Sequence, residues 1–228
     1  YFRAKIEGLF MRFFLMEAGT DDSYWVAQDK DGTLYYFGGT ESGKDAESLI
    51  CDEQCERIFR WNLVLVRDVH GNEVRYVYEK VGGRSYLKEV LYNLHPSSGK
   101  HQHRVVVTYQ GRSDVLTTYQ PGFAVETSRR IKEISVYTDY GYVGWFGPSD
   151  GDGRRLVRRY HLTYDSNSLH SLLTSVSMCG KDDATCLPAV EPEYSEVDGT
   201  HWVEGLGQLD GTVIDMPHSP PRSLGDWR

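Results

Sequence analysis

The sequence has no long apolar run, and this absence sets a first limit on the class of protein. Its longest aliphatic stretches are about four residues, such as LVLV at 63–66, whereas a helix that crosses a bilayer needs about 20. The opening YFRAKIEGLF carries charges where a signal peptide would have an apolar centre. We therefore expect no membrane-spanning helix. A chain that starts at Tyr1 rather than at methionine is expected to be a fragment or a processed product.

An excess of positive charge is also lacking, since the formal net charge is -8. Proteins that bind nucleic acid neutralise phosphates with clustered Lys and Arg, so we expect no nucleic-acid partner. The acidic excess is concentrated in residues 187–228, which also hold five of the eight prolines. Proline removes a donor from a strand ladder and favours edges and extended segments. We predict a β domain over 1–186, followed by an acidic, proline-rich connector or peripheral arm over 187–228.

Helical periodicity is scarce, because no long stripe of apolar residues recurs at spacings of three and four. Only 84–93 and 166–178 fit a short helix, and they fit a strand equally well. Apolar and polar residues instead alternate in many segments, including 61–68, 72–80, 103–110, 130–139 and 156–165. The 16 Tyr and 5 Trp also suit a half-buried pleated surface. These patterns predict a mainly β fold with little helix, in which successive antiparallel hairpins form a large curved sheet.

One interruption of this alternation, DVHGN at 68–72, has two interpretations. Its Asp68, His70 and Asn72 are residues that catalysts use. They also stand beside Gly-Asn, a pair that tolerates the positive φ of tight hairpin turns. We interpret Asp68 and Asn72 as turn formers that join two antiparallel strands, with His70 at an exposed tip.

Motifs that carry chemistry are largely missing. There is no G-x-S-x-G elbow, P-loop or dinucleotide fingerprint. HQH at 101–103 offers two imidazoles without an identifiable third ligand, and we expect an exposed pair at a strand start. DKDG at 29–32 and DGDG at 150–153 lack the twelve-residue loop and terminal Glu of an EF-hand. We therefore predict no catalytic, cofactor-binding or metal-binding residue, and no cofactor.

The four cysteines form two local pairs along the sequence, Cys51 with Cys55 and Cys179 with Cys186. Four cysteines allow three disulfide connectivities, and local pairing is attractive because each pair brackets a polar loop. Free thiols are an alternative. A zinc site of four thiolates is a third, although the C-x3-C and C-x6-C spacings differ from the CxxC knuckles of zinc proteins. All four are candidate disulfide cysteines.

The order of several segments resembles one family. YWVAQDKDGTLYYFGGT at 24–40 is followed by IFRWNLVLVRDVHGNEVRYVYEK at 58–80, TYQGRSDVLTTYQPG at 108–122 and RRYHLTYDSNSLHSLLTSVSMCG at 158–180. This succession, over roughly residues 1–180, is similar to the N-terminal SpvB-type domain. That domain is shared by SpvB virulence proteins and by the B components of insecticidal Tc toxin complexes. Gly111, inserted after YQ, the paired cysteines and HQH depart from the family pattern.

The resemblance implies an architectural role in a secreted toxin complex. In Tc toxins the B component pairs with an RHS-repeat C component, and together they form a hollow β-sheet shell around a toxic polypeptide. This implies a non-enzymatic structural module whose partners are further domains of the parent chain and an RHS-repeat C component. The alternative is a carbohydrate- or host-surface-binding β module of a large secreted YD-repeat protein. An enzyme whose site the sequence does not reveal is a third hypothesis.

Overall fold

The computed structural model describes residues 1–6, 8–20, 22–139, 148–165 and 170–194. Its contacts divide the chain into two units, Tyr1–Pro192 and Glu193–Arg228. Most of the second unit, and of the connector predicted over 187–228, lies outside the described residues. The predicted boundary after residue 186 therefore stays a prediction. In the part that the structure describes, no helix has the length and apolar character needed to span a membrane.

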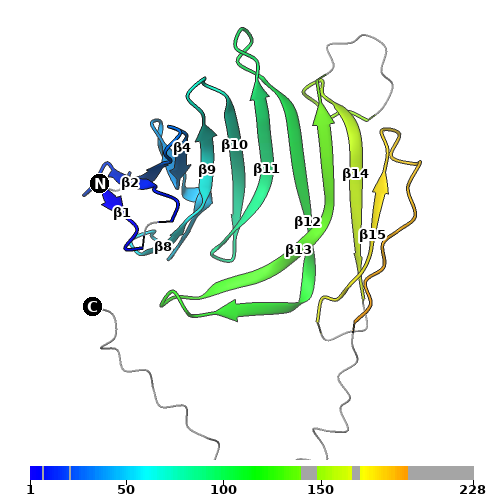
Figure 1. Ribbon diagram of the computed structural model, residues 1–228. Coiled ribbons are helices and arrows are strands. Elements are labelled where there is room, and N and C mark those ends of the chain that lie inside the picture. The colour runs from blue at the N-terminus through cyan, green and yellow to red at the C-terminus, as the bar shows by residue number, and fades with distance from the viewer. Residues whose placement is uncertain (7, 21, 140–147, 166–169, 195–228) are drawn as a thin grey trace, which may run out of the picture. The chain divides into compact units, whose positions relative to one another are not determined.

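Eleven strands form one sheet. They are β1 (Phe2–Arg3), β2 (Arg12–Met16), β3 (Tyr24–Gln28), β4 (Leu34–Phe37), β9 (Leu63–Arg67), β10 (Glu73–Val81), β11 (Arg84–Leu94), β12 (His101–Thr118), β13 (Val125–Thr138), β14 (Arg155–Tyr164) and β15 (Leu173–Cys179). They lie side by side in this order, and each pairs antiparallel with the next. Figure 1 shows the sheet curving from β9 towards β15. The predicted fold class is confirmed.

The sheet is interrupted once along the chain, between β4 and β9. This insertion holds two small hairpins, β5 (Gly39–Thr40) with β6 (Gly43–Lys44) and β7 (Leu49–Cys51) with β8 (Ile58–Trp61). Between them lies the 3-10 helix η1 (Ala46–Ser48), the only helix among the described residues. The Asp45 side chain caps it by accepting a hydrogen bond from the Glu47 amide at 3.2 Å.

The DVHGN segment is a turn between β9 and β10, as predicted. The Asp68 carboxylate accepts hydrogen bonds from the His70 amide at 2.8 Å and from the Asn72 amide at 2.9 Å. Gly71 adopts a φ of 83°, which favours glycine. Asp68 therefore satisfies backbone donors, which is the role of aspartate in Asx turns.

The same turn recurs in both segments that resemble fragments of calcium loops. In DKDGT the Asp29 carboxylate accepts from the amides two and four positions later, at 3.0 and 2.9 Å. In DGDGR the Asp150 carboxylate makes the same two contacts, at 2.9 and 3.2 Å. Gly32 and Gly153 have φ values of 87° and 93°. The D-x-x-G-x pattern thus forms the same hydrogen-bonded turn at three places in the described residues.

The two segments of ambiguous periodicity contain strands and no helix where the structure describes them. Residues 84–93 lie within β11, where Tyr86 is buried. Residues 173–178 lie within β15, and residues 166–169 fall outside the description. Pairing with neighbouring strands favours a strand over a helix in both segments. β11 forms hydrogen bonds with a strand on either side, and β15 forms them with β14.

The hydrophobic core lies where β3, β4, β9 and β10 meet, and Tyr24, Val26, Tyr36, Val64 and Leu65 form its buried cluster. Tyrosine rings supply much of its volume, and their hydroxyl groups find partners. Tyr36 donates to Glu41 at 2.6 Å, and Tyr78 donates to the Leu63 carbonyl at 2.8 Å. Burial, and for Tyr36 also the bond to Glu41, raises the pKa of both phenols to about 12.

Gly38 is the position where the insertion leaves the core sheet, and we expect Gly38→Ala to be strongly destabilising. Its φ is 75°, and an added Cβ would lie 2.3 Å from Trp61 Cδ1 and 2.8 Å from Leu49 Cδ2. Leu49 is fully buried and cannot move aside. Backbone strain and overpacking together should lower the free energy of unfolding by about 2–3 kcal/mol.

Gly71→Ala is the matched control for this substitution. Gly71 has a similar φ of 83°, but no atom lies within 4 Å of an added Cβ. It should therefore incur only the backbone cost, about 1 kcal/mol. Urea unfolding of both variants measures the difference. Equal losses would show that the contact with Trp61 does not constrain Gly38.

Candidate functional site

The longest hairpin of the sheet, β12 with β13, bends part of the way along its length. Gly111 pairs with Arg129, but the next pair is Leu116 with Thr127, so residues 112–115 form a wide bulge in β12. Bulges of this kind bend a strand and redirect the residues beyond them. Figure 1 shows the outer part of the hairpin turning to run beneath β10 and β11. The Glu126 amide there donates to the Gly82 carbonyl in the β10–β11 turn at 2.9 Å.

An ion pair within the bulge holds the bend. Arg112 donates to Asp114 through two nitrogens, at 2.8 and 2.6 Å. Asp114 also accepts from the Ser171 amide at 2.7 Å, which ties the bulge to the segment before β15. The Arg112 and Ser171 hydrogen bonds hold the pKa of the Asp114 carboxyl well below its usual value. Gly111, which pairs with Arg129 just before the bulge, stands at the corner of the sheet.

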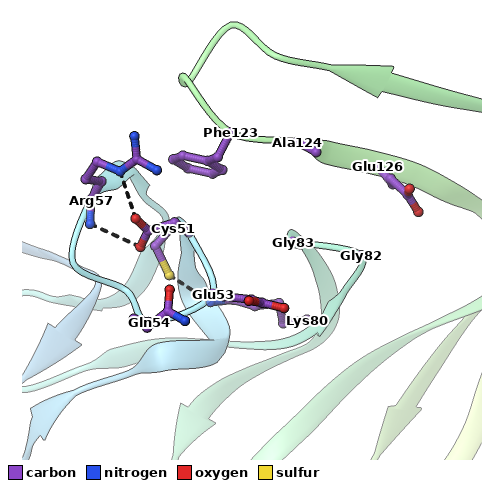
Figure 2. Close-up of a pocket in the computed structure, with 11 residues that line it drawn as sticks. Cys51, Glu53, Gln54, Arg57, Lys80, Gly82, Gly83, Phe123, Ala124 and Glu126 are labelled. Carbon is purple, nitrogen blue, oxygen red and sulfur yellow. Dashed lines mark hydrogen bonds and ion pairs between the residues drawn. The ribbon is translucent and has the colours of Figure 1, made fainter.

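A hollow with a volume of about 700 Å³ lies beside the bent hairpin. Three segments line it: the loop between β7 and β8, the β10–β11 turn, and the start of β13 with the loop before it. Figure 2 shows Phe123 and Ala124 on one side, facing Cys51 and Gln54 on the other. The hollow therefore lies between elements that are distant in sequence.

The polar groups of this hollow contact one another. Asp52 and Arg57 form an ion pair at 2.8 Å, and the Arg57 guanidinium carbon lies 5.7 Å from the centre of the Phe123 ring. Lys80 Nζ lies 3.1 Å from Cys51 Sγ. Burial lowers the pKa of the Lys80 ammonium, although the charges of Glu47 and Asp45 oppose the shift. Asp52 and Arg57 are thus the one ion pair among the described lining residues.

Several lining residues of the hollow already have partners. Among the lining residues, Cys51 is in a disulfide, and Asp52 and Arg57 are already paired with each other. The Arg57 guanidinium lies over one face of the Phe123 ring. This contact joins the bent hairpin to the β7–β8 loop across the hollow.

The HQH segment begins β12. We expected its two histidines to be exposed, but both are half-buried. His103 Nδ1 lies 2.7 Å from the Thr138 hydroxyl, and its ring stacks at a tilt on Tyr92. His101 is held through its carbonyl, which accepts two hydrogen bonds from Arg154 at 2.9 and 2.7 Å. Both residues therefore have structural partners across β11, β13 and the loop before β14.

A buried charge network lies beside this segment. Asp150 bonds to Arg104 at 3.1 Å and to Arg154 at 3.0 Å, and Arg104 also bonds to Glu89 at 2.8 Å. Burial raises the pKa of the Asp150 carboxyl, but the hydrogen bonds from Arg154, the Asp152 amide and Arg104 outweigh it and leave the pKa lowered. The network joins β11, β12 and the loop before β14.

The structure pairs Cys51 with Cys55 and Cys179 with Cys186. The second pair closes a tight turn in which the Gly180 amide donates to the Thr185 carbonyl at 2.8 Å. Beside this pair stand His161 on β14 and Asp183 in the turn. Sequence reasoning missed this grouping, because His161 lies 18 or more residues from the others and only the β14–β15 pairing brings it near. Formation of both disulfides in solution stays a prediction.

The fold is that of the sheet modules found in SpvB-like proteins. Residues 1–108 match the family described as Salmonella virulence plasmid 65kDa B protein. The resemblance to the SpvB-type N-terminal domain is therefore confirmed. A search of curated proteins finds no match for the chain.

Solved structures share the fold. The chain superposes on the structure entitled TcdB2-TccC3-Cdc42 with a TM-score of 0.70 and 18% identity, over 87% of this chain and 12% of that chain. The Tc holotoxin pore of Photorhabdus luminescens gives 0.71 and 19%, over 87% and 11%. The N-terminal domain of SpvB from Salmonella typhimurium strain LT2 gives 0.63 and 17%, over 78% and 68%. The chain thus spans about an eighth of the length of the Tc toxin chains it matches.

Proposed function

We propose that the chain is a non-enzymatic structural module of a secreted toxin-complex B component and contributes to a β-sheet shell that encloses a toxic polypeptide. The observation that carries this proposal is the sheet itself. Eleven antiparallel strands follow one another along the chain, and the sheet superposes on part of the TcdB2-TccC3 structure at a TM-score of 0.70. A curved sheet of this size suits the wall of a shell.

The exposed side chains of the long strands support contacts between the sheet and other protein. The long strands β12 and β13 carry mostly half-buried and exposed side chains, and Val115 and Leu116 are exposed near the bend. Large sheets cover their apolar faces and edges with other protein. The partners we propose are further domains of the parent chain and an RHS-repeat C component.

The beginning of the chain offers a second apolar surface. Ile6 is 87% exposed and Leu9 is 78% exposed, and Tyr1, Phe2 and Phe10 are exposed as well. These residues lie within the first ten positions of the chain, in and on either side of the edge strand β1, and we call them the N-terminal apolar patch. Contiguous exposed apolar residues commonly mark interaction sites. We assign this patch to contact with neighbouring protein in the shell.

The patch gives a direct test in the full-length parent protein, co-expressed with an RHS-repeat partner. Ile6→Asp combined with Leu9→Asp should reduce the yield of the complex on size-exclusion chromatography about tenfold or more, because charge is buried in the contact. Val69→Asp is the control, since Val69 is 65% exposed at the β9–β10 turn and is not one of the patch residues. An unchanged yield of the complex from the double variant would show that the N-terminal apolar patch does not contact neighbouring protein in the shell.

A further inference from the structure

We propose that reduction of the Cys179–Cys186 disulfide converts this end of the sheet into a tetrahedral zinc site. Its four ligands come from β14, β15 and the turn after β15, and they are His161, Cys179, Asp183 and Cys186. Two thiolates, one imidazole and one carboxylate form a ligand set that zinc accepts in proteins. This proposal is independent of the shell function, and it departs from the expectation that no residue binds metal.

The strand register places the ligands together. Cys179 pairs with Arg159 and Ser177 pairs with His161, so His161 is the diagonal neighbour of Cys179 on the same face. Cys186 lies directly opposite Cys179, with their Cα atoms 3.9 Å apart. The ligand atoms of His161, Cys179 and Asp183 all lie within 4.8 Å of one another. Ligand atoms of a tetrahedral zinc ion are about 3.5 Å apart, so small movements of these three side chains suffice, and Cys186 Sγ is free to join them once the S–S bond is broken.

The two oxygen atoms of the Asp183 carboxylate have different surroundings. Its Oδ2 atom accepts a hydrogen bond from Arg159. Its Oδ1 atom is buried without a hydrogen-bond partner, 3.5 Å from His161 Nε2. A buried polar atom without a partner is costly and calls for an explanation. A metal ion between Oδ1 and Nε2 would satisfy it.

The surroundings resemble those of an established metal centre. Glu133 Oε1 lies 3.7 Å from His161 Nδ1, so a carboxylate stands behind the imidazole while Nε2 faces the proposed ion. Such carboxylate–histidine pairs orient metal-binding histidines. The two thiolates, the Asp183 carboxylate and Zn²⁺ leave one net negative charge, which Arg159 is placed to balance.

Opening the disulfide requires two electrons, which a tertiary phosphine supplies in the test. The S–S bond breaks as phosphorus is oxidised, the oxygen of one water molecule bonds to phosphorus, and its two protons go to the two sulfur atoms. Zn²⁺ then displaces both thiol protons, because the thiolate is the ligand. In the oxidised chain the sulfur atoms are bonded to each other and the site is closed.

Zinc binding to the full chain under anaerobic conditions tests the proposal, with competition by a chromophoric chelator as the readout. The reduced Cys51→Ser, Cys55→Ser variant should bind one Zn²⁺ per chain, and the oxidised chain should bind none. Co²⁺ in place of Zn²⁺ should give the absorption of a tetrahedral site together with sulfur-to-cobalt charge transfer. Absence of binding by the reduced variant overturns the proposal.

Ligand variants separate this site from a simple thiol pair. His161→Asn and Asp183→Asn should each weaken zinc binding about a hundredfold, and Glu133→Gln should weaken it about tenfold through the imidazole. Asp182→Asn is the control, because the Asp182 carboxylate accepts hydrogen bonds from Thr185 and Ala184 within the turn and is not one of the four ligands. Circular dichroism confirms that each variant is folded. Unchanged affinity in both His161→Asn and Asp183→Asn contradicts the four-ligand site.

Discussion

Leu65→Ala is expected to lower the free energy of unfolding by about 3–4 kcal/mol. Leu65 lies in the centre of β9 and is only 1% exposed, and it belongs to the core cluster with Tyr24 and Tyr36. Truncation leaves a cavity whose rigid aromatic walls collapse poorly, so both the transfer and the cavity contributions are lost. Urea unfolding followed by tryptophan fluorescence measures the change.

The same substitution at Leu116 provides the control. Leu116 also lies in a strand, β12, but it is 54% exposed. Leu116→Ala should cost less than about 1 kcal/mol, because little apolar surface leaves water there on folding. A loss at Leu65 no larger than the loss at Leu116 would show that the stability of the sheet does not depend on this core.

Asp150→Ala is expected to cost about 3–4 kcal/mol at neutral pH, because it removes the buried carboxylate that Arg104 and Arg154 share and leaves Arg154 with only the exposed Asp152 as an ion-pair partner. The Asp150 side chain is 2% exposed and pairs with two arginines that are themselves largely buried, Arg104 and Arg154. Asp152→Ala in the same loop is the control, because that side chain is 71% exposed. It should cost less than about 1 kcal/mol. Urea unfolding at pH 7 compares the two variants.

The effect of Asp150→Ala should also depend on pH. The pKa of this carboxyl is lowered in the folded state, so its stabilisation is fully present above the unfolded pKa of about 4. It is lost as the pH falls through the folded-state pKa. The difference between the wild-type chain and the variant should therefore shrink as the pH is lowered below about 4. A constant difference down to a pH of about 2 would show that packing, not charge, causes the loss.

Much of the fold was predictable because hairpins are local. Alternation over 61–68 and 72–80 predicted β9 and β10, and the Gly-Asn pair in DVHGN predicted the turn between them. The irregularities were not predictable. The bulge at 112–115 depends on Ser171, which is distant in sequence, and the shift between Val77 and Tyr78 depends on pairing with β11. Local patterns carry no information on such partners.

The candidate sites were less predictable than the fold. The local cysteine pairs were visible in the sequence, but the position of His161 beside Cys179 depends on strand register alone. The histidines of HQH were expected at the surface, yet Tyr92, Thr138 and Arg154 partly bury and hold them. Their environment comes from three other elements, which periodicity within β12 cannot reveal.

The central claim, that the chain is a module of a toxin-complex shell, is tested most directly by purifying the full parent protein from its native source. Mass spectrometry then identifies every protein that co-purifies. We predict an RHS-repeat protein in a one-to-one ratio with the parent. A parent protein that purifies alone, with neither such a partner nor a fused repeat region, would contradict the shell. Binding of that protein to a glycan array would then support a carbohydrate-binding module instead.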